Sequence, residues 1–315
     1  LDTILELPVD FFIILSGDQL YNIDFQKMFN FAKEKDADLT IATLPVCEKD
    51  AKRLGLLKIN KDSYIIDFFE KPQKQEDLDC FRLDPKMNEN CKISEKNPFL
   101  GSMGIYIFKR AALKALLKED PREDFGKHLI PTQLKKGKAA AFIYDGYWED
   151  IGTIKSFYDA NIALTTSNLG LKIYDEKNPI YTCAHHLPGA NIKMTKITDS
   201  IICEGSIIEA KEITKSMIGL RTQIKSGSII KESVFLGNST YSSPEQTQDI
   251  LPDVFEVGQN CIIEKAIIDE HVKIGENVKL INKKNLTSYD SENIYVRDSI
   301  IVVTAGTTLP DNFEF

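Results

Sequence analysis

The sequence predicts an α/β domain with a mixed, mostly parallel sheet, followed by a second domain built as a parallel β-helix. In residues 1–166, short apolar segments alternate with amphipathic ones, the order typical of strands and helices in a sheet covered on both sides. In residues 189–315, isoleucine and valine recur at intervals of five or six residues, with glycine between them. Residues 167–188 contain two prolines and no helical pattern, so they are predicted to be a linker.

The first predicted strand is the apolar run Val9–Leu15, which is typical of a strand buried on both faces. It leads to Ser16-Gly17-Asp18 and then to a helix with one apolar face, for which Asp24 is the predicted N-cap. A chain rarely begins with a central strand of its own sheet, and this one begins at Leu1 rather than Met. We therefore expect the sequence to be a fragment that lacks the start of its first domain.

Apolar runs and turn residues predict the remaining elements of the first domain. A hairpin is expected to turn at residues 60–63, and Lys71-Pro72 ends its second strand because proline cannot donate to the ladder. Residues 73–97 are polar without a clear period and are predicted to be a surface excursion or lid. The other predicted strands are Leu39–Leu44, Leu56–Ile59, Tyr64–Phe69, Ser102–Lys109 and Ala139–Tyr144, with two helical segments before the last.

The repeat in the second half fits neither an amphipathic helix nor an ordinary alternating strand. It fits the hexapeptide coils of a parallel β-helix, in which each turn stacks an aliphatic residue on the one below. A polar loop at residues 238–249 interrupts the pattern, which returns at Val257. A sandwich of short strands is the alternative, but sandwich strands alternate with period two. The repeating isoleucines are Ile197, Ile202, Ile207, Ile213, Ile218, Ile224 and Ile229.

The composition argues against several classes of partner. The chain has 39 basic and 47 acidic residues, a net charge of -8, and no long basic block, so nucleic acid is not an expected partner. No apolar run approaches the roughly 20 residues that span a bilayer, and no secretory signal pattern is present, so no membrane association and a cytoplasmic location are expected. The six cysteines include no CxxC pair and are interpreted as reduced thiols.

Asp18 is the first candidate functional residue. It lies at the carboxyl end of a predicted strand, where open α/β sheets bind ligands, and a carboxylate there can reach a metal ion. The alternative is a cap of a helix or turn. The same two alternatives apply to Asp150, in the segment Tyr147–Thr153, whose Thr153 can also cap the next predicted helix.

The tripeptide Glu70-Lys71-Pro72 places a hydrogen-bond acceptor next to a cation at the end of a predicted strand. A carboxylate suits sugar hydroxyls and an ammonium suits a sugar phosphate. Neighbouring strand residues point to opposite faces, so both can serve one ligand only if the backbone turns, which Pro72 favours. An exposed ion pair is the alternative. Ser102-Met103-Gly104 opens another strand with small residues, either for close approach of a ligand or for tight packing.

Taken in order, the motifs of the first half resemble those of the ADP-glucose pyrophosphorylase family of bacteria and plants. In the second half, Pro179–Thr182, Gly219-Leu220-Arg221 and Ile274–Lys279 are similar to its plant and plant-like bacterial members. The resemblance therefore covers nearly the whole chain. The motifs of the first half are Ser16-Gly17-Asp18, Arg53–Leu56, Glu70-Lys71-Pro72, Gly101–Tyr106, Asp124-Phe125-Gly126 and Tyr147–Thr153.

The resemblance implies a Rossmann-like nucleotidyltransferase sheet followed by a left-handed β-helix that serves regulation and oligomerisation, in a homotetramer or heterotetramer. It implies an enzyme that transfers the adenylyl group of ATP to α-D-glucose 1-phosphate, giving ADP-glucose and pyrophosphate for glycogen or starch synthesis. The location would be the cytoplasm, or the plastid in a plant-like source. In-line attack on the α-phosphorus needs no covalent enzyme intermediate, which agrees with the lack of a nucleophile paired with a base.

The resemblance also implies roles for single residues. Asp18 and Asp150 would hold Mg²⁺ and act in catalysis, while Gly55, Glu70, Lys71 and Ser102 would bind glucose 1-phosphate. Lys279 and Arg297, where the plant-like members have lysines, would bind a phosphorylated three-carbon activator, with Asp298 as a competitor for the Arg297 guanidinium. The alternative is that Lys279 and Arg297 are ordinary solvated side chains.

Two departures from the family pattern qualify these implications. Gln19 stands where many members have His, and the Gly-rich nucleotide-binding loop of the family lies upstream of the segment that begins at Leu1. We therefore expect this chain alone to be inactive. The alternatives are a non-catalytic regulatory subunit, a sugar-1-phosphate nucleotidyltransferase that uses UTP, GTP or dTTP, and a bifunctional acyltransferase.

Overall fold

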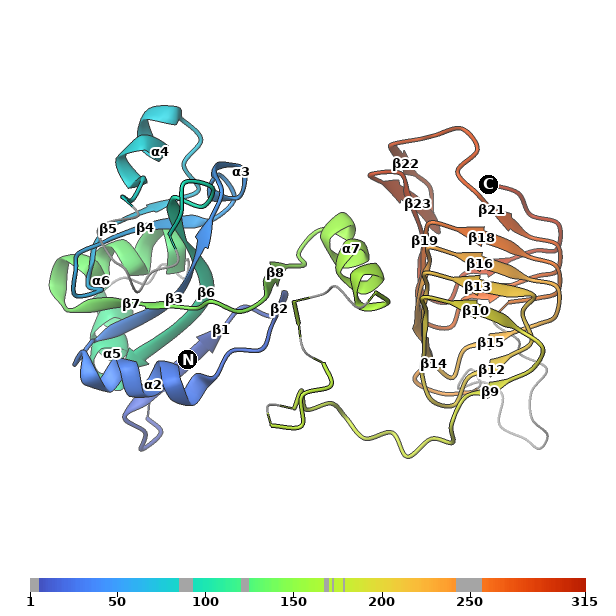
Figure 1. The fold of residues 1–315 in the computed structure, drawn as a ribbon, viewed down its shortest axis with the longest axis horizontal. Coiled ribbons are helices and arrows are strands. Elements are labelled where there is room, and N and C mark those ends of the chain that lie inside the picture. Colours follow the sequence, from blue (N-terminus) through green and yellow to red (C-terminus); the bar gives the residue numbers. More distant parts are fainter. Residues whose placement is uncertain are drawn as a thin grey trace. The chain divides into compact units, whose positions relative to one another are not determined.

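The structure is a computed structural model that describes residues 6–84, 93–119, 125–166, 170–171, 173–177, 179–241 and 257–315. It divides into two compact units, Leu1–Trp148 and Glu149–Phe315 (Figure 1). The domain limits at residues 166 and 188 stay a prediction. None of the described helices is long and apolar enough to cross a membrane.

The first unit contains a six-stranded mixed sheet with the order β5-β4-β6-β3-β7, in which β1 also pairs with β6 (Figure 1). Strands β1, β3, β4 and β7 share one direction, and β5 and β6 run the opposite way. The predicted mixed α/β class is confirmed, although among the described strands of this sheet only β3 and β7 are parallel neighbours. The strands are β1 (Phe11–Leu15), β3 (Leu39–Val46), β4 (Gly55–Ile59), β5 (Ile65–Glu70), β6 (Phe99–Lys109) and β7 (Ala139–Ile143).

Helices cover both faces of this sheet, as the sequence predicts. Ile41 and Phe108 pack with Leu113 of α5 on one face, while Ile107 packs with Met28 of α2 on the other, because strand residues alternate in direction. Asp24 caps α2 by accepting a hydrogen bond from the Lys27 amide at 3.1 Å, which confirms the predicted cap. The remaining elements are β2 (Gln19–Tyr21), α2 (Phe25–Glu34), α3 (Glu48–Ala51), α4 (Gln75–Phe81), α5 (Arg110–Glu119), the π-helical turn η1 (Phe125–Leu129), α6 (Ile130–Lys136) and β8 (Trp148–Asp150).

Two expectations for this unit are wrong. Strand β1 is not buried on both faces: Phe11 packs against Phe29 of α2, but Ile13 and Leu15 on the same face are each 46% exposed. Residues 73–97 are not a surface excursion or lid throughout, since α4 forms within them and buries Leu78 and Phe81 against the sheet. Residues 85–92 of that segment lie outside the described residues.

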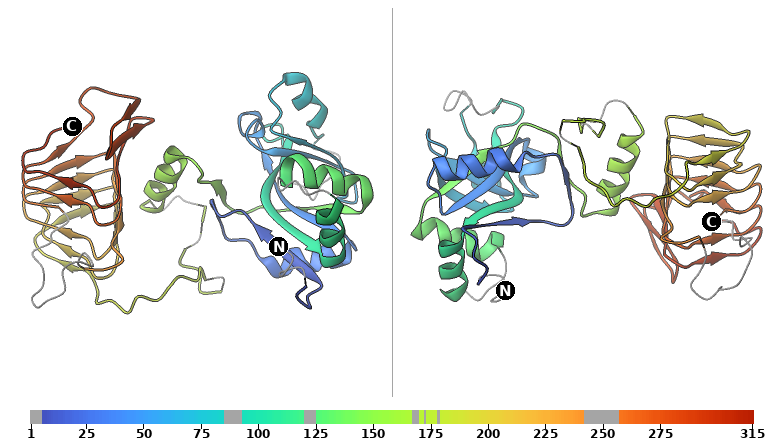
Figure 2. Two further views of the ribbon diagram at one scale, coloured as in Figure 1. Left: turned by 180° about the vertical axis from the view of Figure 1, so that it is seen from behind. Right: turned by 90° about the horizontal axis from the view of Figure 1, so that it is seen from below.

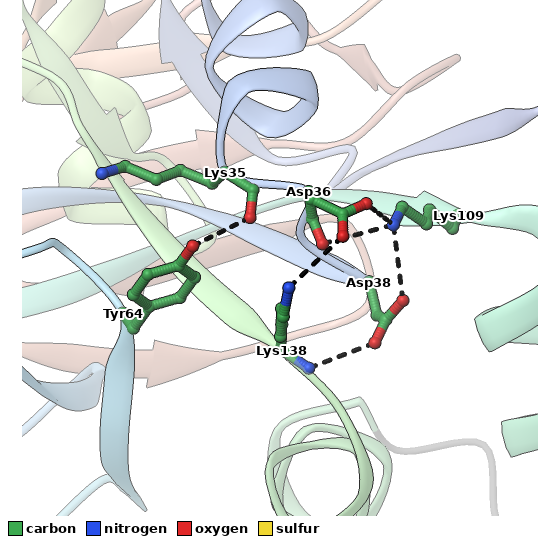
Figure 3. Close-up of polar contacts among 6 residues, drawn as sticks. All are labelled: Lys35, Asp36, Asp38, Tyr64, Lys109 and Lys138. Carbon is green, nitrogen blue, oxygen red and sulfur yellow. Dashed lines mark hydrogen bonds and ion pairs between the residues drawn. The ribbon is translucent and has the colours of Figure 1, made fainter.

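A network of ion pairs joins the start of β3, the start of β7 and the end of β6 (Figure 3). Asp36 accepts hydrogen bonds from Lys109 at 2.6 Å and from Lys138 at 3.3 Å, and Lys109 also lies 3.7 Å from the Asp38 carboxylate. The hydrogen bond from Lys109, and then that from Lys138, holds the pKa of the Asp36 carboxyl below its ordinary value of 3.8.

We expect Asp36→Asn to lower the thermal midpoint of unfolding at neutral pH. A carboxyl with a lowered folded-state pKa stabilises the protein above its unfolded-state pKa, and this contribution disappears as the pH falls through the folded-state value. The difference between wild type and variant should therefore close in acid. Thermal unfolding followed by circular dichroism across the acid range tests this, with Asp62→Asn in an exposed turn as control. A difference that persists unchanged in strong acid would contradict the account.

The second unit is a stack of parallel strands around an apolar core (Figure 2). Its register repeats along one column, in which Ile213, Ile230, Ile263 and Leu280 follow one another and are fully buried. The predicted β-helix is thus confirmed. The strands are β9 (Asn191–Ile192), β10 (Lys196–Thr198), β11 (Ile201–Ile202), β12 (Ile207–Ile208), β13 (Glu212–Thr214), β14 (Met217–Leu220), β15 (Gln223–Ile224), β16 (Ile229–Lys231), β17 (Val234–Gly237), β18 (Ile262–Glu264), β19 (Ala266–Ile268), β20 (Lys273–Ile274), β21 (Lys279–Leu280), β22 (Ser288–Asp290), β23 (Ile294–Arg297), β24 (Ile300–Val303) and β25 (Thr308–Leu309).

Details of the β-helix differ from the predicted repeat. Ile207 and Ile229 are only partly buried, and their neighbours Ile208 and Ile230 fill the core instead. Strands β22 and β23 add an antiparallel hairpin to the last coils. Helix α7 (Ile154–Leu164) packs on the coils through Tyr158, whose hydroxyl donates to the Glu232 carbonyl at 2.6 Å. The predicted loop at residues 238–249 lies partly outside the described residues, which resume at Val257.

Candidate sugar-phosphate and metal site

The predicted sugar-phosphate residues lie in one row across three adjacent strands. Gly55 at the start of β4 pairs directly with Glu70 at the end of β5. On the other side of β4, Leu56 pairs with Gly101 of β6 in an antiparallel register, so Gly55, one residue before Leu56, lies beside Ser102, one residue after Gly101. The sheet therefore carries a carboxylate, a glycine and a hydroxyl side by side.

The backbone turns at Lys71, as Pro72 predicts. Lys71 has a left-handed backbone with φ of 50°, and its amide donates to the Leu54 carbonyl at 3.1 Å. Its ammonium lies 3.9 Å from a Glu70 carboxylate oxygen, with the Lys71 side chain 61% and the Glu70 side chain 23% exposed. The two side chains thus share one side of the strand end, where a ligand carrying hydroxyls and a phosphate can meet both.

The loop after β1 approaches the same stretch of β6. Strands β1 and β4 occupy the same edge of β6, since β3 covers the other edge along its length. Gly104, with φ of 68°, sits at a register shift between β3 and β6, and its carbonyl accepts from the Ser16 amide at 3.2 Å. A Cβ on Gly104 would lie 2.6 Å from the Ser16 hydroxyl, so only glycine permits this approach.

Ser102 is 8% exposed, and its hydroxyl accepts from the Gly104 amide at 3.3 Å. This contact supports tight packing, and the hydroxyl keeps a proton that it can donate. Asp18 follows Ser16 in the loop after β1 and is exposed. The structure therefore brings the Ser16–Asp18 and Ser102–Gly104 motifs together on β6, between the stretches that pair with β4 and with β1.

Gln19 lies between Gly104 and the only tryptophan of the chain. Its amide oxygen accepts from the Trp148 indole at 3.3 Å, and its amide nitrogen would lie 2.8 Å from a Cβ on Gly104. Gln19, the departure from the family pattern, thus links Trp148 to the stretch of β6 around Gly104. The sequence marked Gln19 as unusual but did not predict this contact.

Asp150 and Thr153 are placed locally by hydrogen bonds. The Asp150 carboxylate accepts from the Gly152 amide at 3.0 Å, and Thr153 caps α7 together with Ser156, which confirms the capping role of Thr153. Asp18 belongs to the first unit and Asp150 to the second, so their joint binding of a metal stays a prediction.

Within the described parts of the chain, no group of three or more His, Cys, Asp or Glu side chains is arranged to hold a metal ion. Mg²⁺ commonly binds through one or two carboxylates together with substrate phosphates and water. An exposed carboxylate such as Asp18, at the carboxyl end of a strand, fits that mode of binding.

Gly126 is a residue of this site that the sequence did not assign. It lies in η1, and a Cβ built on it would stand 2.6 Å from a Glu70 carboxylate oxygen. The only signal in the sequence is the triplet Asp124-Phe125-Gly126, whose Asp124 lies outside the described residues. Spacing along the chain gives no sign that this triplet meets Glu70.

The two predicted effector residues lie on the last coils and have carboxylate partners. The Lys279 ammonium lies 2.6 Å from a Glu314 carboxylate oxygen, and Lys283 lies 3.0 Å from the other oxygen. The Lys279 hydrogen bond, followed by that of Lys283, lowers the pKa of Glu314. Arg297 pairs with Asp290 at 2.5 Å rather than with Asp298, because the β22–β23 hairpin places Asp290 alongside it. The expectation for Asp298 is therefore wrong.

Comparison with known families agrees with both halves of this arrangement. Residues 3–167 match the family model described as nucleotidyl transferase, and residues 185–313 match the one described as GLGC left-handed parallel beta-helix domain. The first match spans more than half of the 315 residues. The predicted fold class, an α/β nucleotidyltransferase sheet followed by a left-handed β-helix, is thereby confirmed. The chain belongs to the nucleotidyl transferase family.

Proposed function

We propose that this protein transfers the adenylyl group of ATP to α-D-glucose 1-phosphate, giving ADP-glucose and pyrophosphate. The observation that carries the proposal is the row of Gly55, Glu70 and Ser102 across β4, β5 and β6, with Lys71 at its end. A carboxylate beside an ammonium matches a ligand that carries both hydroxyls and a phosphate. The match to both a nucleotidyl transferase model and a GLGC β-helix model supports the same reaction.

Each residue has a distinct part in the proposed reaction. Glu70 accepts hydrogen bonds from sugar hydroxyls, Ser102 donates one, and Lys71 binds the phosphate of the sugar. Gly55 lets the Glu70 carboxylate lie over β4 beside the sugar, because a Cβ there would stand 2.7 Å from Glu70 Oε2. Asp18 and Asp150 hold Mg²⁺, which neutralises phosphate charge when it is bound. Catalysis then consists of orientation of the sugar phosphate for in-line attack, with no covalent enzyme intermediate.

The proposal extends to assembly and regulation. We infer a homotetramer or heterotetramer, activation by a small phosphorylated metabolite at Lys279 and Arg297, and a role in glycogen or starch synthesis in the cytoplasm or plastid. The left-handed β-helix with its exposed basic residues supports a regulatory role for the second half of the chain. The domain limits at residues 1–166, 167–188 and 189–315 belong to the same proposal.

We expect Lys71→Ala to raise KM for glucose 1-phosphate about fivefold with little change in kcat. The ammonium touches a phosphate that is charged in the ground and transition states alike, so its loss weakens both equally. The effect is modest because the Lys71 side chain is 61% exposed. An ion pair at such an exposed position contributes about 1 kcal/mol of interaction free energy. Steady-state kinetics of the full natural chain test this, with the exposed Lys61→Ala as control. A change confined to KM for ATP would contradict the assignment.

A further inference from the structure

The Glu70 carboxylate lies against two glycines from different elements. A Cβ built on Gly55 of β4 would stand 2.7 Å from Glu70 Oε2, and one built on Gly126 of η1 would stand 2.6 Å from the same atom. Real Cβ atoms essentially never come within 3.0 Å of a heavy atom outside their own residue and its two chain neighbours. The carboxylate can therefore occupy this position only because both residues are glycine.

Aromatic contacts hold η1 against the sheet. Phe125, next to Gly126, stacks on Tyr106 of β6 with ring centroids 5.7 Å apart and an angle of 10° between the planes. It also lies 6.0 Å from the ring of Phe108 on the same strand. Single π-helical turns such as η1 occur frequently at functional sites. The turn is thus fixed relative to β6, the strand that carries Ser102.

The surroundings of the two glycines differ. At Gly55, an added Cβ would also meet the ring of Phe68 at 2.6 Å, and this ring packs against the buried core. At Gly126, the three nearest atoms all belong to the Glu70 carboxyl group. That group ends a flexible side chain that is 23% exposed, so it can move away from a methyl group without disturbing the core. A methyl group at Gly126 therefore meets the Glu70 carboxylate first, and this carboxylate can shift.

We propose that Gly126 is a positioning residue that sets where the Glu70 carboxylate meets the sugar hydroxyls of the substrate. This inference rests on the proposed function, because it assumes that Glu70 binds the sugar. A hydrogen bond between a hydroxyl and a charged acceptor loses strength steeply when the acceptor is displaced. Gly126 thus acts through Glu70 and does not touch the substrate.

The test uses the full natural chain and the variant Gly126→Ala. KM for glucose 1-phosphate should rise about fivefold, while kcat and KM for ATP change less than about twofold, because the lost contact is present in ground and transition states alike. The thermal midpoint should stay within about 3 °C of wild type, since the group that moves is the end of a flexible, partly exposed side chain. Loss of folding, or an unchanged KM for glucose 1-phosphate, would overturn the inference.

A matched control makes the same change beside another carboxylate. An added Cβ at Gly137, the C-cap of α6, would press on Asp38, which belongs to the network at the start of β3. Gly137→Ala should lower the thermal midpoint and leave KM for glucose 1-phosphate unchanged. An equal rise of this KM in both variants would mean that general strain, rather than the place of Glu70, is responsible, and would overturn the inference.

A double-mutant cycle separates this inference from the proposed function. Glu70→Asp should raise KM for glucose 1-phosphate by itself, and addition of Gly126→Ala should then raise it less than about twofold further, because the shorter side chain withdraws from the methyl group. Full additivity would overturn the role of Gly126 while the function stands. If the wild-type protein neither binds nor uses glucose 1-phosphate, both the role of Gly126 and the proposed function are overturned.

Discussion

Asp18→Asn is expected to lower kcat by about a hundredfold or more while the fold stays intact. Asp18 is exposed in the loop after β1, so an isosteric amide there disturbs no packing. The carboxylate would supply negative charge to a bound Mg²⁺, and an amide supplies none. The Mg²⁺ concentration for half-maximal rate should rise as well. Steady-state kinetics over a range of Mg²⁺ concentrations measure both effects.

Asp62→Asn is the control for Asp18→Asn, because it removes an exposed carboxylate from the turn between β4 and β5. Its kcat and its dependence on Mg²⁺ should match those of wild type. A kcat for Asp18→Asn within about threefold of wild type at saturating Mg²⁺ would show that Asp18 is no metal ligand.

The double change Lys279→Ala and Arg297→Ala should raise the activator concentration needed for half-maximal activation at least about tenfold. Both cations lie on the last coils, and each is paired with a carboxylate that the proposed activator would have to displace. Removal of one of these competitors should have the opposite effect, so we expect Glu314→Gln to lower the activator concentration needed. Activation curves with 3-phosphoglycerate as the probe measure both shifts.

Lys196→Ala provides a matched control for the effector residues. Lys196 pairs with Glu212 at 3.1 Å on the first coils, as Lys279 pairs with Glu314 on the last. Its activation curve should match wild type, and basal activity should change little in all of these variants. An unchanged curve in the double variant would reject the site, and loss of basal activity would indicate a structural role.

The repeat in the second half predicted the β-helix but not its core in detail. A period of five or six residues identifies coils, yet each coil turns sharply, and either of two adjacent isoleucines can point inward. Ile208 and Ile230 fill the core where the sequence favoured Ile207 and Ile229. The antiparallel β22–β23 hairpin has no hexapeptide period, so neither it nor the Asp290 partner of Arg297 could be predicted.

In the first half, local signals predicted local geometry. Pro72 after Lys71 predicted a turn, and the left-handed backbone of Lys71 provides it. Strand order cannot be predicted from such local signals, because it depends on contacts between segments that are far apart in the sequence. The sequence therefore gave no sign that β1 would be partly exposed, or that η1 would bring Gly126 to Glu70.

The most direct test of the account is the reaction itself. The full natural chain is incubated with glucose 1-phosphate, Mg²⁺ and one nucleotide at a time, and sugar nucleotide and pyrophosphate are quantified. We predict ADP-glucose and pyrophosphate in equal amounts from ATP, and much less product from UTP, GTP or dTTP. Preferred use of another nucleotide would contradict the adenylyl assignment, and no product from any nucleotide would contradict the proposed reaction.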